Sequence, residues 1–196
     1  MIEHPESASG LSSPHSLRNR LTRVLWSIVY GLLFRPSPRP FHRYRRGLLR
    51  LFGASLHPTS RVYPKARIWH PGNLVMGPFA CLGDHAECYN VTTITIGEWA
   101  VVSQYAYLCG ATHDHEDPAF PLVPRPITLG RRVWIAADVF VAPGVTVGDG
   151  TVVGARSSVF KDLPPWQVCM GSPARVVRPR GLGPADFGDP DPSGVA

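Results

Sequence analysis

The densest group of titratable side chains in this 196-residue chain is the run from His113 to Asp117, which reads His-Asp-His-Glu-Asp. A histidine side chain can accept a proton from a hydroxyl group near neutral pH, so this run is a candidate general-base site. A loop histidine without any chemical role is the alternative interpretation. The surrounding sequence must therefore indicate whether a defined structure holds this run in place.

An aliphatic residue recurs every six positions in the C-terminal two thirds of the chain, and a small residue usually follows it. The clearest series comprises Leu129, Ile135, Val141, Val147, Val153 and Val159, and earlier series comprise Val62, Ile68 and Leu74, then Met76, Leu82 and Cys88, then Ile96, Val102 and Leu108. Alternation within a hexad makes a short strand, and one turn per hexad winds the strands into stacked coils. The repeat therefore predicts a mainly β, parallel β-helix solenoid. Spacing alone fixes neither its hand nor the number of hexads per coil.

Two insertions interrupt the six-residue period. Two residues are added between Cys88 and Ile96, and a longer excursion separates Leu108 from Ile127. In a solenoid such insertions form loops on one face, often the binding face. Because the longer excursion contains the His113–Asp117 run, the solenoid is expected to present this run at its surface.

The N-terminal part of the chain is basic. Residues 1–83 carry eleven arginines and one lysine against Glu3 and Glu6, which is ten net positive charges, whereas the remainder carries a net charge of −4. We expect residues 1–16 to be a disordered lead and residues 17–56 to form a basic helical segment with apolar positions at helical spacing. These positions are Leu17, Leu21, Val24, Leu25, Ile28 and Leu32.

Two interpretations of the 17–56 segment remain open. It could lie on an anionic membrane surface, or pack on the core with its arginines in solvent. No nucleic-acid motif accompanies the charge, so we expect no nucleic-acid partner. The β-helix should span residues 57–180, and the Gly/Pro/Asp-rich segment 181–196 should be disordered.

The chain is expected to be cytoplasmic, with at most a peripheral contact at the inner face of the membrane. No apolar run approaches the roughly 20 residues that a membrane-spanning helix needs. The first apolar stretch also lies too far into the chain for a signal peptide. The four cysteines form no CxxC pair, so they are expected to be reduced and buried as small residues.

Several motifs resemble those of the hexapeptide-repeat acyltransferases, whose fold is a left-handed parallel β-helix. The motifs are Thr112–Asp114, Pro126–Gly130, Val133–Ala136, Ala142–Gly148, Val153–Ala155, Lys161–Pro165 and Gly171–Arg175. They are similar to the maltose, galactoside and nodulation-factor O-acetyltransferase branch. Within that branch, Cys88–Val91, Ser103–Leu108 and Asp117–Leu122 resemble the colanic acid biosynthesis acetyltransferases. The resemblance covers about residues 17–180.

The resemblance implies a homotrimer with acetyl-coenzyme A in a groove between adjacent solenoids, His113 as catalytic base, and no metal. It places near the coenzyme Trp134, Ala137, Ala142, Ala155, Lys161 and Arg175. Candidates for contact with a saccharide acceptor are Asp84, Tyr89, Asn90, Tyr107 and His115. Asp114, Glu116 or a backbone carbonyl would orient His113. The chain departs from the galactoside branch at Asp114, where that branch has proline, and at 83–90, where it has an asparagine-rich acceptor segment.

The expected activity is direct O-acetylation of a sugar hydroxyl in exopolysaccharide, colanic-acid-like, or oligosaccharide biosynthesis. N-acetylation of an amino sugar would use most of the same machinery. A non-catalytic solenoid scaffold would not need the histidine-rich loop. A solenoid carbonic anhydrase would need three histidines on zinc. His113 and His115 supply two from one loop, and His85 would have to supply the third.

Overall fold

A computed structural model of the chain describes residues 17–188. The expected disordered lead, residues 1–16, lies outside this range, as do residues 189–196 of the tail. Helix α1 (Leu17–Val29) continues into a short π-helix, η1 (Tyr30–Phe34). After a proline-rich break comes α2 (His42–Leu51). No helix in the described range is long and apolar enough to cross a bilayer.

Three sheets of short parallel strands follow the helices. Sheet A has the order β1 (Ser55–Leu56), β4 (Leu74–Met76), β7 (Ile94–Ile96), β12 (Ile127–Leu129) and β15 (Thr146–Val147). Sheet B has the order β2 (Arg61–Val62), β5 (Cys81–Leu82), β8 (Val101–Val102), β13 (Trp134–Ile135), β16 (Val152–Val153), β18 (Gln167–Gly171) and β19 (Ala174–Pro179). Sheet C has the order β3 (Arg67–Ile68), β6 (Glu87–Tyr89), β9 (Tyr107–Cys109), β14 (Phe140–Val141) and β17 (Ser158–Val159). Only the final pair, β18 and β19, is antiparallel among these three sheets.

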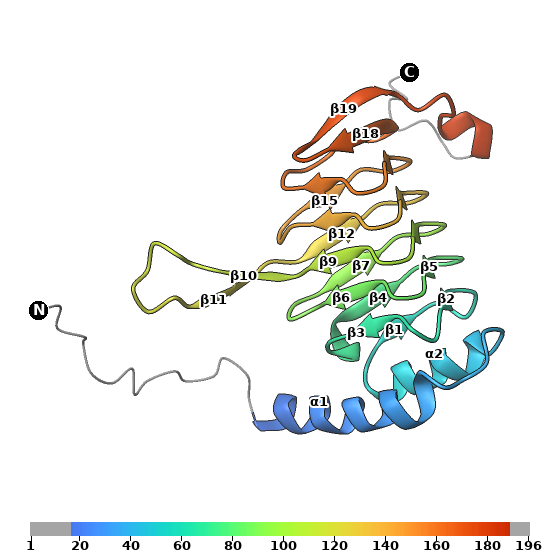
Figure 1. Ribbon diagram of the computed structural model, residues 1–196. Helices are drawn as coiled ribbons and strands as arrows, with labels where there is room; N and C mark the ends of the chain where they lie inside the picture. The colour runs from blue at the N-terminus through green and yellow to red at the C-terminus, as the bar shows by residue number, and fades with distance from the viewer. Residues whose placement is uncertain (1–16, 189–196) are drawn as a thin grey trace, which may run out of the picture.

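Each coil contributes one strand to sheet A, one to sheet B and one to sheet C, so the coils stack into a three-sided prism (Figure 1). The aliphatic residue of each hexad points into the prism. Ile96, Val102 and Leu108 are fully buried, as are their counterparts Ile135 and Val141 in the next coil. The predicted β-helix is therefore confirmed, although its first strand begins at Ser55, two residues before the expected boundary.

The small residue after each inward aliphatic allows successive coils to stack closely. Gly97 shows the reason, because a Cβ atom there would lie 2.6 Å from the carbonyl oxygen of Gly130 in the next coil. No real Cβ atom tolerates that distance from a backbone atom, so this corner requires glycine.

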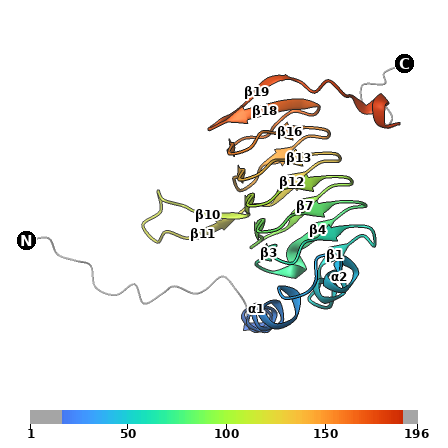
Figure 2. The ribbon, with the colours of Figure 1, turned by 45° about the vertical axis from the view of Figure 1, so that its right-hand side comes forward.

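The helices close one end of the prism, which we call the base (Figure 2). Trp26 is buried and its indole Nε1 donates to the carbonyl oxygen of Ile68 at 2.8 Å. Arg45 of α2 is fully buried, whereas Arg20, Arg35 and Arg43 are exposed, so the arginines of this segment do not all lie in solvent. The predicted apolar stripe does not pack on the core either. From Leu21 to Leu32 its described members are 53–71% exposed.

The C-terminal segment is described as far as residue 188. Pro184–Phe187 forms a short 3-10 helix, η3. The Phe187 ring lies 5.8 Å from that of Trp166 and 4.3 Å beneath the Arg132 guanidinium. These contacts hold η3 against the corner between sheets A and B.

Candidate active site

The longer excursion forms an antiparallel hairpin of β10 (Ala111–His113) and β11 (Leu122–Pro124). It leaves the prism between β9 and β12, at the edge where sheet C meets sheet A, which we call the C–A edge. Figures 1 and 2 show it projecting well beyond the body of the prism. Gly110 anchors its root, because its N–H donates to the Tyr89 carbonyl and its carbonyl accepts from the Arg125 N–H, both at 2.9 Å.

His113 ends β10 and is exposed. Its Nδ1 lies 2.8 Å from the carbonyl oxygen of Phe120, and its ring stacks on the Phe120 ring at 4.5 Å and 8°. A carbonyl oxygen only accepts, so Nδ1 must carry the hydrogen. In the neutral ring the lone pair is then on Nε2, which is the arrangement a general base needs. A backbone carbonyl, rather than Asp114 or Glu116, makes the orienting contact.

The acidic residues of the run shape the hairpin tip instead. Asp114 accepts from the backbone N–H of Glu116 at 3.1 Å, and Asp117 accepts from that of Ala119 at 2.8 Å. The His115 and Glu116 side chains approach to 3.2 Å but are 80% and 87% exposed. So exposed a pair contributes little to stability, and His115 remains accessible at the tip.

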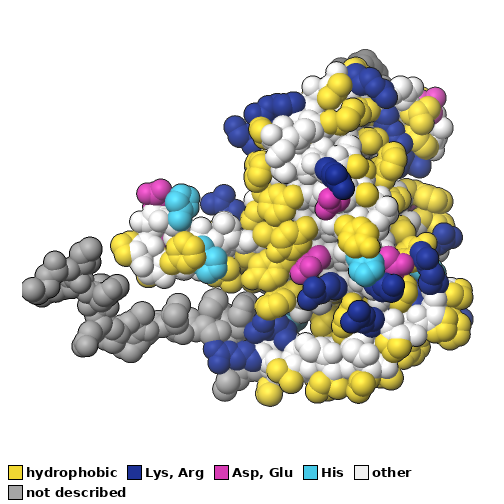
Figure 3. Space-filling view, viewed as in Figure 1, with side chains coloured by type: hydrophobic (Ala, Val, Ile, Leu, Met, Phe, Trp, Pro, Cys, Tyr) yellow, Lys and Arg dark blue, Asp and Glu magenta, His cyan; other side chains and the backbone are white. Residues whose placement is uncertain are grey.

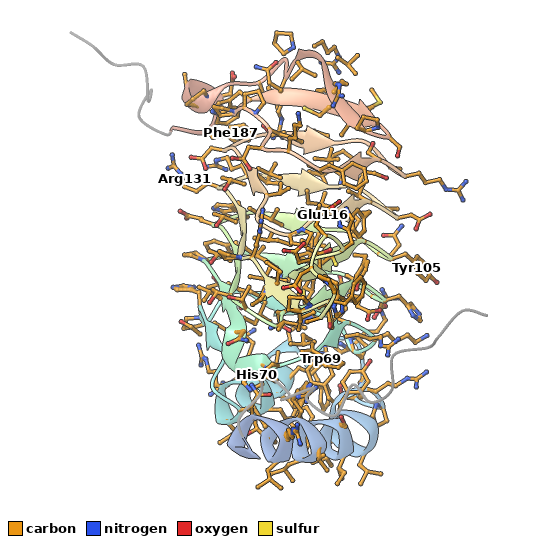
Figure 4. All side chains as sticks on the ribbon, turned by 90° about the vertical axis from the view of Figure 1, so that its left-hand side faces the viewer. Trp69, His70, Tyr105, Glu116, Arg131 and Phe187 are labelled. Atoms are coloured by element: carbon orange, nitrogen blue, oxygen red, sulfur yellow. The ribbon has the colours of Figure 1, made fainter. Side chains whose placement is uncertain are left out.

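A second group of candidates lies along the edge between sheets B and C, which we call the B–C edge. Asp84 is there, 3.2 Å from an Nη2 of Arg39, in a hollow also lined by His85 and Tyr105. Ala137 and Ala155, one coil apart, line the next hollow with Tyr105, Asp138 and Arg156. Figure 4 shows the Glu116 hairpin tip facing the viewer and Tyr105 at the side of the prism.

The remaining coenzyme candidates are dispersed. Ala142 and Lys161 belong to the C–A edge, one coil apart, with Ala142 buried and Lys161 exposed. Trp134 faces outward from sheet B, half exposed, and donates through Nε1 to the Ser103 hydroxyl at 3.0 Å. Arg175 is exposed on β19 at the far end of the prism.

Sheet C between the two edges carries outward-facing aromatic side chains. The Tyr107 ring lies 5.7 Å from that of Phe140, which lies 5.8 Å from that of Phe160. Figure 3 shows this apolar column beside the hairpin. Burial, and then a hydrogen bond with Cys109, raises the pKa of the Tyr107 phenol, so its hydroxyl stays protonated. Tyr89 continues the aromatic surface toward Trp69, 5.2 Å away.

Asn90 has a structural role. It is fully buried, its Nδ2 donates to the carbonyl oxygen of His70 at 2.7 Å, and its Oδ1 accepts from the His70 N–H at 3.0 Å. The side chain bridges two coils and is not exposed to a saccharide. We therefore remove Asn90 from the candidate acceptor residues.

Within one chain the candidates form two groups that do not meet. His113, Ala142 and Lys161 lie at the C–A edge, whereas Asp84, Ala137 and Ala155 lie at the B–C edge, and sheet C separates the groups. The sequence reasoning missed the stacked rings of His85 and Tyr105, 4.9 Å apart at the B–C edge. Both residues occupy the same corner position in successive coils, and this equivalence could have predicted that their rings stack.

The cysteines of residues 17–188 are free thiols. Cys88 and Cys169 are fully buried, and no cysteine of this range is in a disulfide. Burial raises the pKa of the Cys88 thiol to about 12. No group of three His, Cys, Asp or Glu side chains in the described range is arranged to hold a metal ion.

A three-sided β-helix of hexads with a histidine-bearing hairpin at one edge defines a hexapeptide-repeat protein. The family model "Bacterial transferase hexapeptide (six repeats)" matches residues 126–161. The chain is 46% identical to WcaF of Escherichia coli strain K12 over 177 residues, 89% of this chain and 97% of WcaF. The name of that relative provisionally assigns it to colanic acid biosynthesis as an acetyltransferase.

Solved structures agree with this assignment. Galactoside acetyltransferase in complex with coenzyme A matches with a TM-score of 0.77 and 25% identity, covering 89% of this chain and 88% of that one. A hexapeptide-repeat acetyltransferase of Vibrio cholerae O1 biovar eltor, complexed with acetyl-coenzyme A, matches with a TM-score of 0.75 and 25% identity over 92% and 94% of the chains. The chain belongs to the hexapeptide-repeat acetyltransferases, and the resemblance found in the sequence is confirmed.

Proposed function

We propose that this acetyltransferase transfers an acetyl group from acetyl-coenzyme A directly to a sugar hydroxyl, with His113 as general base. The acceptor is a saccharide of exopolysaccharide, colanic-acid-like, or oligosaccharide assembly. The observation that carries the proposal is the contact between Nδ1 of His113 and the Phe120 carbonyl, which leaves Nε2 as the basic nitrogen. The identity to WcaF over nearly its whole length supports the substrate class.

The chemistry follows from this tautomer. Nε2 of His113 takes the proton of the acceptor hydroxyl as its oxygen attacks the thioester carbonyl carbon. When the tetrahedral intermediate collapses, the carbon–sulfur bond breaks and the proton passes from His113 to the departing thiolate. The Phe120 carbonyl, which accepts from Nδ1 throughout, stabilises the imidazolium formed in between.

The separation of the candidates supports a site shared between copies of the chain. In a closed ring of three parallel prisms, the C–A edge of one copy meets the B–C edge of the next, and sheet C faces the threefold axis. The apolar column of Tyr107, Phe140 and Phe160 suits that central position, since exposed apolar surface of this kind favours burial. His113 would then face Asp84 and Tyr105 of the adjacent copy.

The same arrangement suits the coenzyme. The small side chains of Ala137 and Ala155 leave the B–C edge open beside Tyr105. The exposed cations Lys161 and Arg175 are suited to phosphate groups. We therefore place the coenzyme along the upper coils, and the acceptor in the lower hollow at Asp84, with Tyr89, Tyr107 and His115 beside it.

The first test is His113→Ala, assayed with acetyl-coenzyme A and a panel of free and lipid-linked oligosaccharides. Loss of a general base costs about 10²–10⁴ in rate, so kcat should fall at least about a hundredfold while fold and assembly persist. His57→Ala is the matched control, because this exposed histidine lies between β1 and β2, away from both edges, and the variant should retain wild-type activity. Near-wild-type turnover by the His113 variant would remove the assignment. If only amino sugars were acetylated, the proposed activity would be N-acetylation instead of O-acetylation.

The second test measures complementation between two inactive chains. Ala155→Trp fills the B–C edge and leaves His113 intact. His113→Ala removes the base and leaves the B–C edge open. In trimers assembled from an equal mixture, about a quarter of the sites combine two intact edges. Co-expression should therefore restore about a quarter of wild-type activity, and a mixture that stays inactive would refute the shared site. A peripheral membrane contact, one of the two interpretations of residues 17–56, would use a different surface, the base of the prism.

A further inference from the structure

The base of the prism exposes an apolar face that nothing in the described chain covers. In α1 and η1 it comprises Leu21, Val24, Leu25, Ile28, Leu32 and Leu33, each between 47% and 71% exposed. Phe41, Tyr44 and Leu51 extend it across α2, with Leu51 81% exposed. Figure 3 shows apolar side chains along this lower rim, and Figure 4 shows side chains projecting from the underside of the helix.

This face is directed away from the prism. On the other side of α1, Trp26 points into the prism and its indole donates to the Ile68 carbonyl, and Phe34 is fully buried at the end of η1. The inward contacts therefore need only the opposite side of the helix, and they leave the apolar stripe outward. Soluble monomers rarely expose large contiguous apolar patches, so a face of nine exposed apolar side chains indicates a binding surface.

The charge around the face selects its partner. Arg20, Arg35 and Arg43 are exposed on the same helical layer, and the sequence has no acidic residue between Ser7 and Gly83. An apolar helix face flanked by arginines and free of carboxylates matches an anionic lipid surface. The same face on a second copy would carry the same charge, which disfavours pairing of two bases.

We propose that the base formed by α1, η1 and α2 docks in the interface of an anionic membrane, so that the enzyme works peripherally at a lipid surface. In the proposed trimer, the three prisms stand side by side and contact one another through their lateral surfaces. Their three bases then lie in one plane. This step rests on the proposed function. Three bases then bind one bilayer together, which strengthens binding without any new contact.

Vesicle flotation of the full chain tests the proposal without acetyl-coenzyme A or acceptor. The probes are phosphatidylcholine vesicles with and without phosphatidylglycerol. The wild-type chain should float with the anionic vesicles only, and less at high salt. Leu21→Gln with Leu32→Gln should weaken binding at least about tenfold, because two exposed apolar side chains leave the lipid. Arg43→Gln should weaken it roughly fivefold.

Matched controls at the other end of the prism separate docking from general surface effects. Val177→Gln with Leu182→Gln removes apolar side chains that are 58% and 46% exposed and should leave vesicle binding unchanged. His113→Ala should also bind as the wild type does, so failure of the proposed chemistry would not be mistaken for failure of docking. Absence of wild-type flotation would overturn the proposal. A smaller assembly of the leucine variant in gel filtration would also overturn it, by assigning the face to contact between copies.

Discussion

Arg45 joins the helical base to the solenoid, and its replacement should be among the most destabilising single changes in the base. Its side chain is fully buried. Nε donates to the carbonyl oxygen of Val62 at 2.7 Å, Nη1 to that of Pro38 at 2.7 Å, and Nη2 to that of Arg39 at 2.5 Å. Nη1 also donates to the Ser37 hydroxyl at 2.9 Å. One guanidinium therefore ties the linker between the helices to strand β2 of the first coil.

Arg45→Met keeps the length of the side chain but removes every one of these donors. Hydrogen bonds from a charged donor contribute about 1.5–3 kcal/mol each, and part of this is recovered because the buried charge disappears. We expect a net loss of about 3–5 kcal/mol in the free energy of unfolding. For a chain of this size the melting temperature should fall by roughly 10 °C.

The assay is urea and thermal unfolding followed by circular dichroism, with two comparison variants. Arg43→Met changes an exposed arginine of the same helix and should stay within about 0.5 kcal/mol of the wild type. Arg45→Lys keeps the charge but cannot match the planar fork, so it should resemble Arg45→Met. If Arg45→Met were no less stable than Arg43→Met, the guanidinium would not be what joins the base to the solenoid.

Further predictions concern three individual residues. Gly97→Ala should destabilise the fold by at least about 1–3 kcal/mol in urea unfolding, because its Cβ would meet the Gly130 backbone at 2.6 Å. Burial raises the pKa of the Cys88 thiol to about 12, so its thiolate is scarce at pH 8. Alkylation of Cys88 should therefore be roughly a thousandfold slower in the folded protein than in the unfolded protein. Above about pH 9 the thiol of Cys88 ionises in the unfolded protein but stays protonated in the folded protein. The free energy of unfolding should therefore fall as pH rises above about 9, and it should fall less in Cys88→Ala. Phe120→Ala removes the ring under His113 but keeps the carbonyl, so kcat should fall by roughly tenfold or less, with the pH–rate profile retaining its form; a loss as large as that of His113→Ala would contradict the orienting role given to the carbonyl.

The side chains that point into the prism could be predicted from the sequence, because local patterns determine them. Alternation within a hexad and the corner after it decide which side chain enters the core, and Ile96, Val102 and Leu108 are fully buried as expected. The stripe of α1 shows the limit of the method. Helical spacing groups Leu21 and Ile28 on one face, but the direction of that face depends on where Trp26 packs, which is a tertiary contact.

The candidate site depends on the side chains at the outer surface of the prism, where residues that are neighbours in space are far apart in the sequence. Asp84, Gln104, Ala137 and Ala155 occupy one corner in successive coils, although they are separated by 20, 33 and 18 residues. Three hexads make 18 residues per coil, and the first two intervals are lengthened by the two insertions. Hexad spacing leaves the number of hexads per coil undetermined, so the B–C edge could not be assembled from the sequence. Once three hexads per coil are known, both insertions fall at the C–A edge, where the imidazole lies, and the open alanines fall at the B–C edge, on the opposite side of sheet C. The proposed site, which uses both, therefore draws on two copies of the chain.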